Sequence, residues 1–331
     1  MYAVALGCVP SLALYGQSAD TTKPYTLPPA TVSVTRTDVP LTNVPLSIHT
    51  VDRAEISRAK PTWGLDEALA NYYRGKGLAI VFTVDATDGL NRAAEAPELV
   101  SAGRSITDTM VQRLYREWVF AVANRIRPEY LGLAAETNLI RQLAPDSVYQ
   151  ALVTMANAVV AQMRAASLPS TLYISVQVET VWGRPSGPYQ GIAQDLADFP
   201  FVEALGLSSY PYLGGFADPE SIPLDYYSRI PQGTTLPVLV VEGGWPSVSV
   251  GGVVSSPAEE ARYITRQERL LDSARAKGVF QLTFYDLDLS GFPPLPPGSI
   301  LPLFTHLGLA DSAMNAKPAL AVWDGVFRRS R

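Results

Sequence analysis

The chain contains little of what disulfides, metal sites and histidine-based catalysis require. Cys8 is the only cysteine among 331 residues, so an intrachain disulfide and a multi-thiolate metal site are both excluded. His49 and His306 are the only histidines, which excludes a histidine-rich metal site and gives a Ser-His-Asp triad only two potential bases. We therefore expect carboxylates to carry the chemistry, with no metal and no cofactor.

Positive charge and long apolar runs are also scarce. The net charge is -5 with a pI near 5.2, and no basic run appears, so a nucleic-acid surface is not expected. No uninterrupted apolar stretch reaches the roughly 18 residues of a membrane-spanning helix. Hydrophobic residues make up 47% of the chain and charged residues 17%, which is enough for a sizeable core. We expect a folded protein, a monomer without a membrane span.

Three segments are predicted from the pattern along the chain. Residues 1–26, which include "MYAVALGCVPSLALYGQSAD", predict a signal-like or disordered tail. The stretch is apolar and closes on small residues, as a secretory signal does, but it lacks the basic start and so resembles a poor or truncated signal. A signal there would make the protein secreted or periplasmic, and otherwise we expect it in the cytoplasm. Residues 27–74 form a separate segment, and residues 75–331 form the main domain.

The main domain alternates strands and helices from Gly77 onward. Its strands are nearly continuous apolar runs, which is typical of parallel strands covered on both faces. Six strand-helix units are found, and the strands end near residues 85, 136, 178, 210, 242 and 286. This spacing favours an α/β fold of the (β/α)8 TIM-barrel type, which usually takes about 250 residues. A doubly wound open sheet is the alternative, although no Gly-rich phosphate loop follows the first clear strand.

A complete barrel needs eight strands, and the upstream segment offers two alternatives. In the first alternative, "ATVSVTR" and "VPLSIHTVD" are the first two strands, and the first two strand-helix units of the barrel are incomplete or atypical. Ala30–Ala70 also resembles the start of the plug domain of TonB-dependent receptors of bacterial outer membranes. The stretches "VSVTRT", "VPLSIHTVDRAEI" and "LDEAL" carry that resemblance. No alternating transmembrane strands follow, so a receptor function is not implied.

In a TIM barrel the active site lies at the C-terminal ends of the strands. A buried strand that ends in an acid must leave that acid solvated, paired or functional. Several such acids on one face indicate a site, and the polar strand-end residues are Asp85, Asp88, Glu136, Asn138, Gln177, Glu179, Ser208, Ser209, Tyr210, Glu242, Trp245, Tyr285, Asp286 and Asp288.

The stretch "LPVLVVEGGWPS" is similar to the seventh-strand motif of family 17 and family 53 glycoside hydrolases, retaining TIM-barrel enzymes of clan A. Counting back from "VFQLTFYDLDL" as strand eight, the resemblance implies that Glu242 is the nucleophile. It implies that Glu136, which ends strand four, is the acid/base. It also implies a set of substrate-binding residues, with Tyr210 beside the nucleophile and the aromatics as sugar platforms: Tyr210, Glu179, Trp182, Asn138, Trp245, Tyr212, Tyr285 and Asp85.

Two carboxylates suit glycoside hydrolysis, because one protonates the leaving oxygen while the other attacks the anomeric carbon. Retaining enzymes hold the two roughly 5 to 5.5 Å apart, and inverting enzymes roughly 6.5 to 9.5 Å. The sequence departs from the clan in three places: Ala135 stands where an Asn normally precedes the acid/base, the usual strand-two Arg cannot be placed, and Tyr285 or Phe284 replaces the strand-eight Trp. We expect cleavage of a poly- or oligosaccharide with retention. The alternatives are a non-catalytic carbohydrate-binding barrel and an envelope-associated interaction module.

Overall fold

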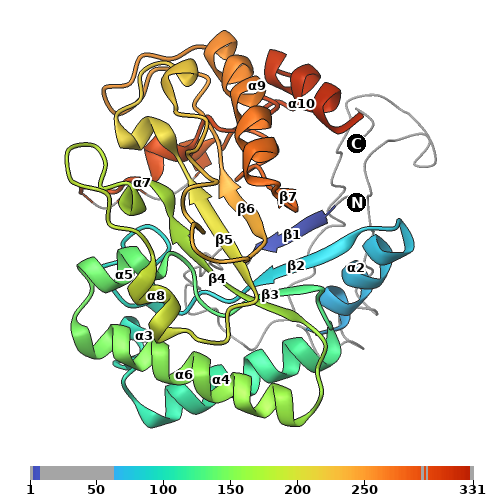
Figure 1. Cartoon of the computed structure of the whole chain (residues 1–331), viewed down its shortest axis with the longest axis vertical. Coiled ribbons are helices and arrows are strands. Elements are labelled where there is room, and N and C mark those ends of the chain that lie inside the picture. Colours follow the sequence, from blue (N-terminus) through green and yellow to red (C-terminus); the bar gives the residue numbers. More distant parts are fainter. Residues whose placement is uncertain (1–2, 8–62, 292–293, 296, 329–331) are drawn as a thin grey trace, which may run out of the picture. The chain divides into compact units, whose positions relative to one another are not determined.

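The computed structural model describes residues 3–7, 63–291, 294–295 and 297–328 (Figure 1). The chain divides into two compact units, one of Met1–Cys8 with Ala70–Arg331 and the other of Val9–Leu69. The sheet and the candidate site belong to the first unit. Residues 8–62, with both alternative barrel strands and most of the plug-like stretch, lie outside the described part. The choice between those two interpretations therefore stays open.

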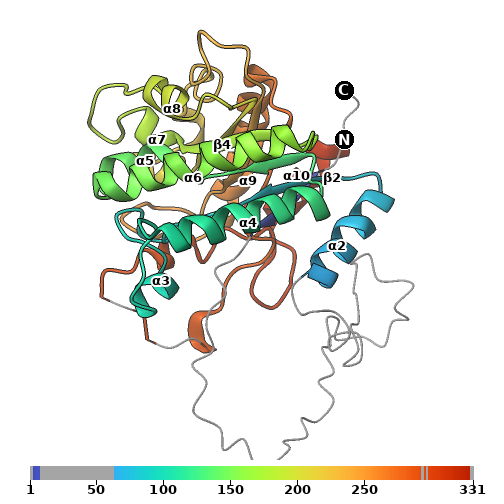
Figure 2. The same cartoon turned by 90° about the horizontal axis from the view of Figure 1, so that it is seen from below.

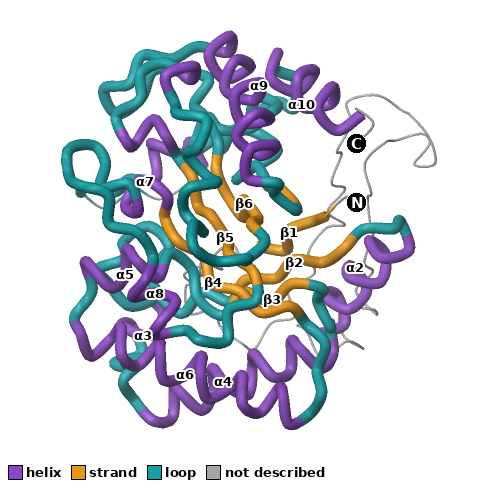
Figure 3. Tube along the Cα trace, in the orientation of Figure 1, coloured by secondary structure: helices purple, strands orange, loops and turns teal. Residues whose placement is uncertain are grey.

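Seven parallel strands form one sheet whose spatial order follows the chain. Parallel neighbours in chain order need helical crossovers, which is how an α/β barrel is built. The strands curl around one another (Figure 3), but within the described ranges none joins β7 to β1. The predicted TIM-type fold with incomplete units is thus confirmed as an incomplete α/β barrel. The strands are β1 (Ala3–Gly7), β2 (Ala79–Thr83), β3 (Tyr130–Gly132), β4 (Thr171–Gln177), β5 (Ala204–Ser209), β6 (Val238–Gly243) and β7 (Gly278–Val279).

Helices follow the strands and cover the sheet. Figure 2 shows α4 lying beside α6, and α9 packs against α10. Ser256 caps α9, because its hydroxyl accepts the backbone N–H of Glu259, as a serine before a Pro-led helix predicts. The helices are α2 (Trp63–Gly75), α3 (Pro97–Ser101), α4 (Thr109–Arg125), α5 (Thr137–Leu143), α6 (Asp146–Ala165), α7 (Val178–Val181), α8 (Ala193–Asp198), α9 (Pro257–Ala274) and α10 (Pro318–Arg328), with 3-10 turns η2 (Pro211–Gly214), η3 (Pro219–Ser221), η4 (Leu289–Gly291) and η5 (Leu301–Phe304).

The strands bury apolar side chains on both faces. Fully burying one Leu or Val contributes about 1.5 to 3 kcal/mol, so both faces drive the sheet to form. Toward the helices, β5 and β6 contribute Leu205, Leu207, Val238 and Val240. Toward the inside of the curled sheet lies a smaller cluster of Val81, Tyr173, Ala204, Leu239 and Phe280, with Tyr130 and Val241 packed against it.

Two elements differ from the sequence prediction. Ala3–Gly7, within the expected tail, forms β1 and pairs with β2 from Ala3 opposite Ala79 to Gly7 opposite Thr83. The last strand was expected over 279–289, but β7 spans only Gly278–Val279. The chain leaves the sheet there and exposes about half of the Phe284 and Tyr285 side chains. None of the helices in the described ranges is both long and apolar enough to cross a bilayer.

Candidate active site

Glu136 lies directly after β3 in a strained backbone conformation. Its φ of 48° and ψ of 46° are left-handed, a region that costs a non-glycine residue about 1 to 3 kcal/mol. The left-handed residues Arg127, Ser167 and Arg275 each follow the end of a helix, where that conformation is common, whereas Glu136 precedes α5. Residues with such strained backbones cluster at functional sites, so the conformation of Glu136 indicates that its side chain has a function.

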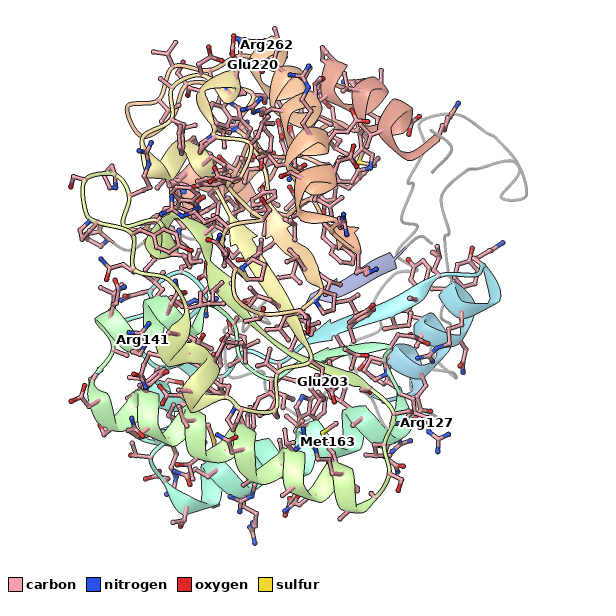
Figure 4. All side chains as sticks on the ribbon, viewed as in Figure 1. Arg127, Arg141, Met163, Glu203, Glu220 and Arg262 are labelled. Atoms are coloured by element: carbon pink, nitrogen blue, oxygen red, sulfur yellow. The ribbon has the colours of Figure 1, made fainter. Side chains whose placement is uncertain are left out.

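Helix α5 is anchored on both of its neighbours, which fixes Glu136 at its start. The Glu136 N–H donates to Ser175 Oγ of β4 at 2.9 Å. The Thr137 hydroxyl donates to the fully buried Asp195 of α8 at 2.9 Å, and Arg141 pairs with the other oxygen of Asp195 at 2.9 Å. Figure 4 shows Arg141 at the α5 side of the molecule, near α8. The strained residue is therefore held from both sides.

Glu242 reaches the inside of the sheet because β6 contains a bulge. Leu207 pairs with Val240, but the next residue, Ser208, pairs with Glu242, so Val241 is extra. Val240 lies on the helix side, and strict alternation would send Glu242 there as well. The bulge moves it to the inner face, as bulges next to active sites do. Gly243 then passes Ser209 so closely that a Cβ would lie 2.5 Å from the Ser209 carbonyl oxygen.

Ser208 lies between the two glutamates. Its Oγ is 2.6 Å from Glu136 Oε1 and 2.5 Å from Glu242 Oε1. Those two carboxyl oxygens are therefore at most 5.1 Å apart, the sum of the two distances. This upper bound falls below the roughly 6.5 Å at which inverting enzymes begin, and it lies at the lower end of the roughly 5 to 5.5 Å of retaining glycosidases.

Arg92 supplies the positive charge of the site. It is 6% exposed, and it follows β2 in the loop where Asp85 also lies. Its Nε pairs with Glu136 Oε2 at 2.8 Å, and its Nη1 pairs with Asp85 Oδ2 at 2.5 Å. Asp85 is oriented by Thr87, whose N–H and hydroxyl both donate to Asp85 Oδ1 at 3.1 Å. The cation thus lies on the Glu136 side of the pair.

The electrostatics separate the two glutamates. Burial and, second to it, the negative charge of Glu136 raise the pKa of Glu242 from 4.5 to about 7. The Ser208 hydrogen bond and the Arg92 charge lower the pKa of Glu242 but do not cancel the rise. The carboxylates of Asp85 and Glu136 in turn raise the pKa of Arg92, which keeps it protonated. Glu242 is therefore the carboxyl of the pair with a reason to hold a proton near neutral pH.

Tyr173 of β4 forms the floor beneath the carboxylates. It is fully buried, and its hydroxyl is hydrogen-bonded to Thr83 Oγ1 at 2.5 Å. The ring lies over Gly132 so closely that a Cβ there would be 2.6 Å from Tyr173 Cζ. Burial and the charge of Glu242 raise the pKa of Tyr173, which places the phenol near that carboxyl.

Tyr210 and Glu179 border the pair. Tyr210 ends β5, is 5% exposed, and has its pKa raised by burial and by the charges of Glu242 and Glu136. Its ring packs edge-on against Phe304, with centroids 5.0 Å apart. Glu179 accepts from the Tyr210 N–H and from the Tyr226 hydroxyl, each at 3.0 Å. Burial raises the pKa of Glu179 to about 7. Both predicted residues therefore adjoin the site.

The structure uses four of the other predicted residues differently. Trp245 is fully buried, stacks on Tyr263 and donates its indole N–H to Ser255, so it leaves no ring face open to a sugar. Tyr212 is 2% exposed and donates its hydroxyl to the Leu303 carbonyl. Both rings are core residues here.

Trp182 and Asn138 also bond within the protein. Trp182 stacks on Tyr226, with centroids 5.3 Å apart, and donates its indole N–H to the Tyr226 carbonyl. Asn138 bonds both backbone groups of Gln177, at 3.0 Å to the carbonyl and 2.8 Å from the N–H, which fastens α5 to β4. Tyr285 is 48% exposed, so it alone among the predicted aromatics presents half of its surface.

Arg92 and the bridging role of Ser208 were not foreseen. Ser208 was one of many polar strand-end residues, and its alternation with the outward Leu207 could have placed it inside the sheet. Arg92 follows Asp85 by seven residues in an irregular loop, so no periodicity indicated where its side chain would go.

Two further observations bear on what the site could bind. Within the described ranges no three His, Cys, Asp or Glu side chains are grouped to hold a metal ion. A hollow of about 510 Å³ lies at the opposite ends of β5 and β6, away from the glutamates. It is lined by apolar and uncharged residues, namely Leu196, Phe199, Pro200, Val202, Gly233, Thr234, Thr235 and Leu236.

Comparisons with known proteins agree with the fold. No protein-family model and no curated protein matches the sequence. Among solved structures, the chain is similar to the GH53 catalytic domain of Ignisphaera aggregans, at 15% identity and a TM-score of 0.55, over 78% of this chain and 77% of that one.

Two other solved structures are larger proteins, and this chain matches less than half of each. The exo-beta-1,4-mannosidase Op5Man5 of Opitutaceae bacterium strain TAV5 is 17% identical with a TM-score of 0.54, over 84% of this chain and 49% of that one. The beta-D-glucuronidase of Dictyoglomus thermophilum is 13% identical with a TM-score of 0.53, over 80% and 43%. At these identities the likeness shows the fold alone, an α/β barrel.

Proposed function

We propose that the protein is a retaining glycoside hydrolase that cleaves a poly- or oligosaccharide with Glu242 as nucleophile and Glu136 as acid/base. The observation that carries the proposal is the carboxyl pair bridged by Ser208, whose bridged oxygens are at most 5.1 Å apart. Attack on the anomeric carbon and protonation of the leaving oxygen need two carboxyls at this spacing. Glu136 follows β3 and Glu242 lies near the end of β6, and these strands are three positions apart, as strands four and seven are in clan A.

The assignment of roles follows from which strand each residue ends. In the resemblance to clan A, the seventh-strand Glu attacks and the fourth-strand Glu protonates. Asp85, Tyr210, Glu179 and the half-exposed Tyr285 are proposed to contact the substrate. Trp245, Tyr212 and Trp182 act through packing, and Asn138 acts through its hydrogen bonds to the Gln177 backbone. The surrounding carboxylates suit hydroxyl-rich ligands, because a carboxylate accepts hydrogen bonds from sugar hydroxyls.

The test is a substrate screen with an active-site control. Chromogenic glycosides, with β-mannosides and β-glucuronides included because structural neighbours carry those names, are assayed beside plant and bacterial polysaccharides. Hydrolysis by the wild type and its loss in Glu242→Ala is the expected result. The anomeric configuration of the product, followed by proton NMR at early times, should be the same as that of the substrate. An inverted product would overturn the retaining mechanism.

One observation favours the alternative of a non-catalytic carbohydrate-binding barrel. Arg92 pairs with Glu136, the residue that has to act as an acid, and a neighbouring cation favours the ionised form of a carboxyl. A binding barrel would retain sugar affinity in Glu242→Gln and show no turnover in either form. Isothermal titration with the same oligosaccharides distinguishes the two functions.

A further inference from the structure

The contacts of Ser208 fix how many protons the carboxyl pair holds. The Oγ lies 2.6 Å from one carboxyl oxygen and 2.5 Å from the other, and both are hydrogen-bond distances. A serine hydroxyl has a single proton, so it donates to only one of the two. The second short contact needs a proton on the carboxyl itself, which then donates to Ser208 Oγ. One of the two glutamates is therefore a carboxylic acid in this arrangement.

The charges around the pair identify which carboxyl carries the proton. Arg92, from the loop after β2, bonds Glu136 Oε2 and stabilises Glu136 as the anion. Glu242 has no cation in hydrogen-bond contact among its described interactions, and it faces the carboxylates of Glu136 and Asp85. The remaining titratable neighbours are Tyr210 at the end of β5 and Tyr173 of β4, both neutral phenols because their pKa values are raised. The proton therefore lies on Glu242.

This resting arrangement is the reverse of what hydrolysis requires. The proposed nucleophile, Glu242, has to be ionised, and the proposed acid, Glu136, has to be protonated. We propose that Ser208 is a positioning residue that relays one proton from Glu242 to Glu136 and so converts the resting pair into its reactive form. This inference rests on the proposed function for its role in turnover.

The relay step conserves atoms and charge. The Glu242 Oε1–H bond breaks as that proton bonds to Ser208 Oγ. The original Ser208 O–H bond breaks as its proton bonds to Glu136 Oε1. Ser208 remains a neutral hydroxyl, Glu242 becomes the carboxylate and Glu136 becomes the acid. No oxidant, reductant or co-reactant takes part.

Arg92 keeps a carboxylate partner after the proton has moved to Glu136. It holds Asp85 through Nη1 at 2.5 Å as well as Glu136 through Nε at 2.8 Å. When Glu136 becomes neutral, the ion pair with Asp85 persists. A cation with a second carboxylate partner therefore permits Glu136 to alternate between anion and acid.

The chain offers a matched control next to the relay. Ser209 is also fully buried on β5, and its Oγ accepts from the Tyr227 hydroxyl at 3.1 Å. It points away from Ser208, toward the helix side. Ser209→Ala removes a buried hydroxyl of the same size from the same strand without touching the carboxyl pair.

The first measurement is infrared and needs no substrate. At pH 6, the difference spectrum between the wild type and Glu242→Gln isolates the carboxylic-acid C=O band of Glu242. Ser208→Ala is expected to shift that band to higher frequency, because the acid loses its hydrogen-bond acceptor, while Ser209→Ala leaves it in place. Absence of the band in the wild type, or an unshifted band in Ser208→Ala, would overturn the relay.

The second measurement is kinetic. Positioned proton transfer contributes about 10² to 10⁴-fold to a rate, so Ser208→Ala should lower kcat by about 10²-fold with little change in KM. Its pH-rate profile should shift, Ser208→Thr should recover much of the rate, and Ser209→Ala should match the wild type. A Ser208→Ala variant that behaves like Ser209→Ala would sink the relay while leaving the hydrolase function intact. If no glycoside is hydrolysed, the proposed function fails, and the infrared result alone decides the relay.

Discussion

Two carboxyl pairs in the described part of the chain differ in what lies between their acids. In one, the neutral Ser208 hydroxyl lies between Glu136 and Glu242, with Arg92 on the Glu136 side. In the other, the ammonium of Lys317 lies between Glu260 and Asp286, at 3.0 Å and 2.9 Å. An ammonium has three protons and donates to both acids at once, whereas a hydroxyl has a single proton to donate.

The second pair, with Lys317 and His306, is called the lysine cluster below. It ties α9, which carries Glu260, to the loop after β7 and to the residue before α10. Lys317 also donates to Ser247 at 3.0 Å, just after β6. The lysine cluster therefore joins four segments that are far apart in the chain.

The largest expected effect is on the serine-bridged pair. Glu242→Gln keeps the shape of the side chain but removes the carboxylate that attacks, so we expect kcat/KM for any glycoside found to fall at least about 10³-fold. Thermal unfolding should change little, because an amide in that place has no charge to bury. Glu260→Gln, assayed in parallel, is expected to retain most of the activity. An active Glu242→Gln variant would contradict the proposed nucleophile.

The lysine cluster should show the opposite behaviour, with a loss of stability. Lys317→Met leaves two buried carboxylates without their cation, and breaking a buried ion pair this way costs about 3 to 5 kcal/mol. Urea unfolding at pH 9 and at pH 7 measures the loss. The loss should be smaller at pH 7, because burial raises the pKa of Glu260 to about 8 and its acid form, which predominates below that pH, needs no cation. A loss below about 1 kcal/mol would mean that the ammonium is not needed there.

The pH dependence of stability separates Glu242 from an ordinary ion pair. The pKa of Glu242 is 4.5 when unperturbed and about 7 in the folded protein, so the folded state binds its proton more tightly than the unfolded chain. The associated stability is complete below pH 4.5 and is lost as the pH rises to about 7, a change of about 3 kcal/mol. Urea unfolding of the wild type between pH 5 and 8 should fall more steeply than that of Glu242→Gln. Parallel slopes would refute the raised pKa.

Much of this arrangement could be predicted from the sequence, for a physical reason. Continuous apolar runs followed by polar residues locate parallel strands and their C-terminal ends, which brought Glu136 and Glu242 to one face. The bulge at Val241 could not be predicted, because it depends on register against β5 and not on the apolar pattern. Strands that are apolar on both faces carry no signal for which side a terminal residue faces.

The sequence was least informative about the aromatic residues. Trp245 follows a strand end that carries an acid, as a sugar platform would, yet the glycines before it turn the chain so that the ring stacks on Tyr263. Composition does not distinguish a buried ring from an exposed one, because aromatics favour both settings. Contacts between distant segments, such as Arg92 with Glu136, are likewise fixed only when the sheet is assembled.

The smallest expected effect tests whether the lysine cluster depends on its cation or on the number of its polar contacts. His306 Nδ1 lies 3.3 Å from Asp286 Oδ2, but its side chain is 41% exposed, and exposed pairs contribute about 0 to 1 kcal/mol. Asp286 keeps Lys317 at 2.9 Å and the Gly308 N–H at 3.0 Å without it. His306→Gln should therefore cost less than about 1 kcal/mol in urea unfolding at pH 7, several times less than Lys317→Met. A comparable loss would show that the lysine cluster depends on every polar contact. The Lys317 cation would then not be what distinguishes it from the serine-bridged pair.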